Sequence, residues 1–209
     1  MSGIGKYIDL DSIYSSYMNN IYSRPVLMAI LIALLLPFAI MILGFILNYI
    51  GEALAMVFSL FIDPWLVYAT INYLFFPGVM LHELSHAAFA VITGAKVTEV
   101  ALFKREGKSL GHVNFQNRGN TIMRTLQYIF VSSAPMFGGA LVIFLCKLGI
   151  DHIPSNMLWL KIFLGYIGVA MFFHMTMSPQ DIKVYVKGIP LFICIVFVVT
   201  LVLRLTVFG

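Results

Sequence analysis

Long apolar stretches separated by short polar breaks dominate the chain. Residues 26–47 and 125–146 carry no charge, and each is long enough to cross the apolar core of a bilayer, about 30 Å thick. Residues 53–76, 157–177 and 189–203 form three more apolar stretches, and a shorter one surrounds residues 77–93. The pattern predicts an all-α polytopic membrane protein with about six transmembrane helices.

Polar residues mark the expected helix ends. Asn48, Gly51 and Glu52 predict a break after the first helix, and residues 147–156 predict a loop that holds Asp151 and His152. Asp63-Pro64 interrupts the second stretch, which indicates a broken helix or a re-entrant piece because proline lacks a backbone N–H. Asp63 is a candidate site residue, but a helix-starting Asp before Pro is the interpretation that we favour.

The segment between residues 96 and 117 differs in character from the rest of the chain. Residues 97–103 are rich in strand-forming types, residues 104–108 form a charged turn, and residues 112–116 alternate strictly between polar and apolar. Such a pattern predicts a β-hairpin at the membrane surface.

Composition supports a membrane location. Of 209 residues, 61% are hydrophobic and 11% charged, whereas soluble domains average about 25% charged residues. We expect a polar N-terminal segment (1–24) followed by one membrane-embedded domain (25–209). The net charge of +4 bears on orientation in the lipid bilayer rather than on nucleic-acid binding. The sequence does not indicate which membrane holds the chain, or its oligomeric state.

One apolar segment carries a cluster of ionisable residues, His82-Glu83-Leu84-Ser85-His86. In a helix, residues four apart lie on the same face, so His82 and His86 offer two imidazoles to one metal ion. This spacing is typical of zinc metalloproteases, in which the Glu acts as general base. Ionisable residues inside a membrane segment are costly, which favours a functional site over the alternatives, a polar helix contact or a chance match.

A catalytic zinc site needs a third protein ligand. After the motif, Glu99 and Glu106 fall in the predicted hairpin and Asp151 in a predicted loop, whereas Asp181 follows Pro179 beside two apolar stretches. By elimination, Asp181 is the best candidate. The alternative is a carboxylate that caps a helix, which Asp after Ser-Pro-Gln also suits.

Four further residues are candidates for a supporting or substrate-binding role. His174 is an ionisable residue in an apolar stretch that would orient Asp181 or bind substrate, and a core histidine bonded to a backbone carbonyl is an equal alternative. His112 is a possible ligand, but its alternation with Asn114 favours a polar strand face. Asn72 and Gln180 complete the set.

These motifs resemble the site-2 protease family of intramembrane zinc metalloproteases. The resemblance covers residues 70–185: the motif helix, a hairpin, a Gly-rich helix and a late Asp after Pro. Ser178-Pro179-Gln180-Asp181 departs from the family's Asn-Pro-x-x-Asp-Gly form, which suggests a divergent branch without the regulatory PDZ insert.

The resemblance implies cleavage of a peptide bond in or near a transmembrane segment of a membrane-protein substrate. One zinc ion would be held by His82, His86 and Asp181, with Glu83 as catalytic base. Two alternatives stay open. A membrane zinc protease could cut tails at the membrane face, and a metal-binding scaffold could lack proteolytic activity, although a scaffold does not require Glu83 beside the ligands.

Overall fold

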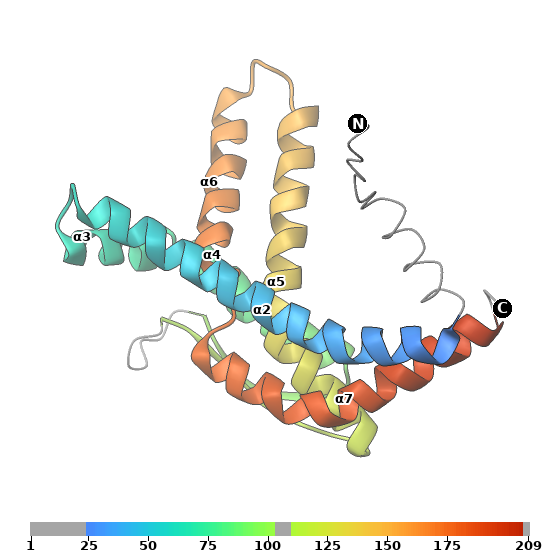
Figure 1. Ribbon diagram of the computed structural model, residues 1–209. Helices are drawn as coiled ribbons and strands as arrows, with labels where there is room; N and C mark the ends of the chain where they lie inside the picture. Colours follow the sequence, from blue (N-terminus) through green and yellow to red (C-terminus); the bar gives the residue numbers. More distant parts are fainter. Residues whose placement is uncertain (1–23, 103–109, 207–209) are drawn as a thin grey trace, which may run out of the picture. The chain divides into compact units, whose positions relative to one another are not determined.

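The computed structural model describes residues 24–102 and 110–206, so residues 1–23 of the polar N-terminal segment and the charged turn at 104–108 lie outside the described residues. Helices and two short strands make up the fold (Figure 1). In chain order they are α2 (Pro25–Ser59), α3 (Pro64–Ala69), the π-helix η1 (Thr70–Leu74), α4 (Phe76–Ile92), β1 (Lys96–Ala101), β2 (His112–Gln116), α5 (Thr121–His152), α6 (Leu158–His174) and α7 (Pro179–Thr206).

Three of these helices, α2, α5 and α7, are long and apolar enough to cross a membrane. The segment Pro64–Leu74 together with α4 would supply a fourth span, although the two parts are bent by 55°. The 17 residues of α6 extend only about 26 Å at 1.5 Å per residue, short of a full crossing. The expectation of a largely helical chain compatible with a membrane is confirmed, whereas six crossings are not.

The chain divides into two compact units. One comprises described residues 24–38 and 192–206, which are the N-terminal part of α2 and the C-terminal part of α7. The other comprises residues 39–191 and contains all remaining elements. Every candidate site residue lies in this second unit, so its packing alone positions the site.

Helix α4 is the element on which the second unit is built, because it contacts α5, α6 and both strands. Helices α5 and α6 run side by side (Figure 1). The approach of α4 to α6 is unusually close at Gly78. A Cβ placed on Gly78 would lie 2.1 Å from the Ala170 carbonyl oxygen, so only glycine fits at this position.

The end of α4 leads directly into the hairpin. Gly94 has a φ of +77°, the left-handed conformation that commonly ends a helix, and the Ala95 N–H donates to the Ala90 carbonyl at 2.8 Å. Strands β1 and β2 then pair antiparallel, with an irregularity between Val97 and Glu99. The predicted hairpin is confirmed. Its apolar face, including Val97 and Phe115, packs against a buried cluster of α4 and α5 residues.

A buried glutamine joins the hairpin to the helices. Gln127 of α5 is fully buried, and its amide nitrogen donates to the carbonyls of Thr93 and Arg118 at 3.0 and 3.1 Å. Its amide oxygen accepts the Arg118 N–H at 2.9 Å. The residues that leave α4 and β2 are therefore both anchored to α5, which fixes where the hairpin sits over α4.

Two predicted breaks are wrong. Helix α2 continues through Asn48 to Ser59, because the Asn48 amide donates to the Glu52 carboxylate one turn later at 3.0 Å and both polar groups are accommodated on the helix surface. Helix α5 continues to His152 in the same way, since Lys147 pairs with Asp151 at 2.7 Å. The last helix begins at Pro179, earlier than expected, so Asp181 lies in its first turn.

Candidate metal centre

Three residues from two parts of the second unit that are far apart in the sequence meet at one point. His82 and His86 lie one turn apart on α4, and their Nε2 atoms are 3.2 Å apart. The His86 Nε2 atom is 3.2 Å from Oδ1 of Asp181, and the His82 Nε2 atom is 3.9 Å from Oδ2. One ligand atom from each residue lies within 4.8 Å of the others, and this is the only group of potential metal ligands of its kind among the described residues.

Two of the three spacings fit a zinc ion. Donors bound to a tetrahedral zinc at about 2.0–2.1 Å lie about 3.3 Å from one another, close to the two separations of 3.2 Å, whereas the His82 Nε2 atom lies 3.9 Å from Oδ2 of Asp181. Two imidazoles and one carboxylate are also a common ligand set of catalytic zinc, which leaves a coordination position open. The residues brought together are those that the sequence predicted.

The ring of His82 is oriented by a helix end. Its Nδ1 atom donates to the carbonyl oxygen of His174 at 2.6 Å, because a carbonyl can only accept. His174 is the last residue of α6, so its carbonyl receives no N–H from a following helical turn. In a continuing helix the N–H of Ser178 would donate to the His174 carbonyl, but here it donates to the Asp181 carboxylate. The Nε2 atom of His82 therefore faces His86 and Asp181.

His86 is held in the same way from α5. Its Nδ1 atom donates to the carbonyl oxygen of Val131 at 2.7 Å, and both residues are buried. Metal-binding histidines usually donate their second N–H to such an acceptor, which fixes the ring and its tautomer. Both histidines thus present Nε2 to the same point, with main-chain carbonyls behind them.

Asp181 is fixed by the start of α7. Its Oδ2 atom accepts the Ser178 N–H at 2.8 Å, and the Ser178 hydroxyl accepts the Asp181 N–H at 3.2 Å. This reciprocal pair is a capping box, with Ser178 at the N-cap and Asp181 three residues later. The proposed ligand and the proposed helix cap are therefore the same carboxylate.

Glu83 lies beside the candidate ligands on α4 and is 7% exposed. The hairpin covers it at one point: a Cβ on Gly111 would come within 2.8 Å of the Glu83 side chain, so the backbone before β2 lies directly against it. A buried carboxylate next to two imidazoles and a second carboxylate is a costly arrangement with few purely structural explanations.

The remaining candidates lie outside the ligand cluster. The His174 ring donates from Nδ1 to the Ala170 carbonyl at 2.8 Å, the kind of bond that the core-histidine alternative expects, while the main-chain carbonyl of His174 accepts from His82. His112 lies 3.5 Å from Glu99 on the hairpin. Asn72 donates to the Tyr68 carbonyl at 2.8 Å, and Gln180 is exposed beside Asp181.

Two acidic alternatives have other roles. Asp63 accepts the Trp65 N–H at 2.8 Å and caps α3, as the favoured interpretation predicted. Asp151 pairs with Lys147.

The sequence did not reveal that the main-chain carbonyls of Val131 and His174 accept from the two histidines, because every residue carries a carbonyl. A proline four residues after Val131 was the one available clue.

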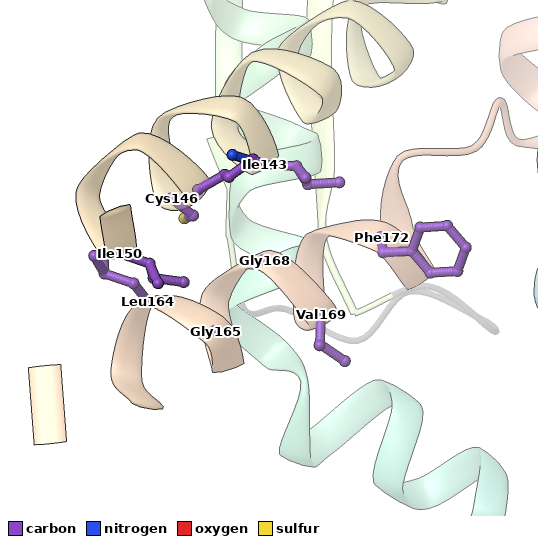
Figure 2. Close-up of a pocket in the computed structure, with 9 residues that line it drawn as sticks. Ile143, Cys146, Ile150, Leu164, Gly165, Gly168, Val169 and Phe172 are labelled. Carbon is purple, nitrogen blue, oxygen red and sulfur yellow. The ribbon is translucent and has the colours of Figure 1, made fainter. Parts of the chain in front are cut away.

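An apolar pocket of about 330 Å³ lies between α5 and α6 (Figure 2). Its lining includes Ile143 and Cys146 from α5 and Leu164, Gly165 and Gly168 from α6, and it contains none of the ligand residues. A smaller pocket of about 150 Å³ is lined by Asn72 and by polar residues of α2, among them Asn48 and Glu52.

The chain matches none of the protein-family models, curated proteins or solved structures with which it was compared.

Proposed function

We propose that this chain is an intramembrane zinc metalloprotease, similar to site-2 proteases, that cleaves a peptide bond in or near a transmembrane segment of a membrane-protein substrate. The observation that carries the proposal is the convergence of His82, His86 and Asp181 beside the buried Glu83. Transport or storage of a metal requires the three ligands but gives no reason for a carboxylate at position 83.

Each residue has a defined role in the proposal. The carbonyl-bound histidines and the capped Asp181 hold zinc, which when bound polarises a substrate carbonyl and acidifies water. Glu83 accepts a proton from the attacking water and passes it to the leaving amine.

The substrate segment must become extended to expose its amides. The two-stranded sheet leaves one edge of each strand without a strand neighbour among the described residues. An extended substrate chain could add to such an edge through main-chain hydrogen bonds. Because Phe115 packs against the core but Val113 does not belong to that cluster, proline at Val113 is the cleaner test of this pairing.

The test uses purified chain reconstituted in vesicles with a library of single-span peptides tagged at both ends, and fragments are identified by mass spectrometry. Wild type should cut within apolar segments, and Glu83→Gln should lower the rate by about 10²–10⁴-fold, the range for loss of a general base. Asp151→Asn, an exposed acid-to-amide control, should leave the rate unchanged.

Other outcomes favour the alternatives. Cuts confined to the tails outside the apolar segments would support a protease that acts at the membrane face. Zinc binding without cleavage of any library member, equal in wild type and Glu83→Gln, would support a non-proteolytic metal-binding scaffold.

A further inference from the structure

The carbonyl that holds His86 belongs to the interior of a helix, where a carbonyl normally has a partner already. In an α-helix the carbonyl of residue 131 would accept the N–H of residue 135. Residue 135 is proline, which has no N–H, and α5 runs through it without interruption. The Val131 carbonyl therefore lacks its usual helical donor, and the His86 Nδ1 atom donates to it at 2.7 Å.

Proline also acts on the direction of this carbonyl. The ring crowds the carbonyl four residues earlier and tends to tilt it away from the helix axis. Val131 and Pro135 are both fully buried in α5, the helix that packs against α4. A tilted carbonyl at that interface is available to a side chain on the neighbouring helix.

The ring of His82 provides an internal comparison. Its acceptor, the His174 carbonyl, also lacks the N–H that a continuing helix would supply, in that case because α6 ends there. The two histidines are thus held by carbonyls without a helical donor, one freed by a helix end and the other by a proline within a helix.

We propose that Pro135 is a positioning residue of the metal centre: it reserves the Val131 carbonyl for His86 and so holds this ring with Nδ1–H behind and Nε2 toward the metal. The inference rests on the metal-binding part of the proposed function and is independent of whether the chain cleaves peptides.

The test restores the missing donor. Pro135→Ala supplies an N–H that competes with His86 for the Val131 carbonyl, and Pro135→Gly supplies the same N–H with a much weaker helix former. Both should weaken zinc affinity by about 10–100-fold, the usual effect of losing a partner that orients a ligand. Pro190→Ala, which changes an exposed proline inside α7, is the control and should change affinity by less than about threefold.

A purely structural role for Pro135 predicts a different pattern. The two variants would then follow helix propensity, with Gly weaker than Ala, and the His86 ring would keep its tautomer. Nitrogen-15 NMR of labelled histidine separates the cases: the variants should change the His86 Nδ1 signal and leave His82 as in wild type. Zinc affinity and a His86 signal unchanged in folded Pro135→Ala would overturn the proposal.

The wild-type histidine spectrum and the zinc-affinity comparison test the role of Pro135 even if the variants do not fold or the chain cuts no substrate. If both variants fail to fold, the wild-type spectrum still decides, because a His86 ring protonated on Nε2 or bound to metal through Nδ1 contradicts the inference. If wild type binds zinc but cuts no substrate, the proposed function fails while the affinity comparison still tests Pro135.

Discussion

Ser178 and Asp181 cap each other: the Ser178 N–H donates to Oδ2 of Asp181 at 2.8 Å, and the Asp181 N–H donates to the Ser178 hydroxyl at 3.2 Å. The other carboxylate oxygen, Oδ1, lies 3.2 Å from the His86 Nε2 atom. Oδ2 thus accepts the Ser178 N–H at the start of α7 and lies 3.9 Å from the His82 Nε2 atom, while Oδ1 lies against His86. The start of α7, including the Ser178 hydroxyl, therefore fixes the position of the third candidate ligand.

This arrangement predicts that Ser178→Ala weakens the metal site without touching a ligand. Loss of an N-cap hydroxyl costs about 0.5–2 kcal/mol, and a frayed first turn would let Asp181 move. Zinc titration should show affinity reduced about 10-fold, as for other losses of orienting partners. Ser178→Thr keeps the cap and should bind as wild type. Ser59→Ala removes a hydroxyl at the end of α2 and should also leave affinity unchanged. Equal affinity in Ser178→Ala would mean that the Ser178 hydroxyl does not support Asp181.

Gly78→Ala tests the close approach of α4 to α6. The added Cβ would lie 2.1 Å from the Ala170 carbonyl oxygen, so the helices must separate, and overpacking of this kind costs about 1–3 kcal/mol or more. Separation would also draw His82 away from its acceptor on α6 and lower zinc affinity.

The matched control is Gly165→Ala in α6, where a Cβ meets open space. There the change should stabilise the helix by about 0.5–1 kcal/mol, because glycine is a poor helix former. Denaturant unfolding of both variants in one detergent checks the opposite signs. A stability gain in Gly78→Ala would show that α4 and α6 are not in close contact.

Gln127→Ala should loosen the hairpin from the helices. The change leaves the Arg118 N–H and the carbonyls of Thr93 and Arg118 without their partner, at about 1–3 kcal/mol for each buried group that stays unpaired. Hydrogen exchange in β1 and β2 should accelerate more than in α4. Gln116→Ala, on an exposed strand position, is the control. Unchanged exchange in the hairpin would remove Gln127 as its anchor.

How far the sequence predicted this site depends on the information that residue types encode. The motif at His82, Glu83 and His86 was predictable, because three ionisable groups at metal-ligand spacing in an apolar helix are energetically costly and therefore indicate a functional site. Asp181 was predictable only by elimination. The two roles that the sequence offered for it, helix cap and candidate ligand, are compatible because the same carboxylate caps α7 and lies beside His86. The acceptors on Val131 and His174 were not predictable in the same way, because every residue carries a carbonyl.

The helix boundaries show a similar limit. Asn48 and Glu52 indicated a break, yet they satisfy each other one turn apart on a continuous helix. Asp63 before Pro64 was predicted correctly because its capping chemistry is local and strong. Local capping can be inferred from a few residues, whereas the end of an apolar helix depends on what its polar side chains meet.

The most direct test of the central claim is the zinc content of purified, folded protein in one detergent. Wild type and Glu83→Gln should each hold close to one zinc per chain, while His82→Ala, His86→Ala and Asp181→Ala should hold almost none, because each removes one of three protein ligands. Asp63→Ala, which removes a helix-capping carboxylate, should retain the wild-type amount. Full zinc retention in Asp181→Ala, or no zinc in any preparation supplied with the metal, would contradict the account.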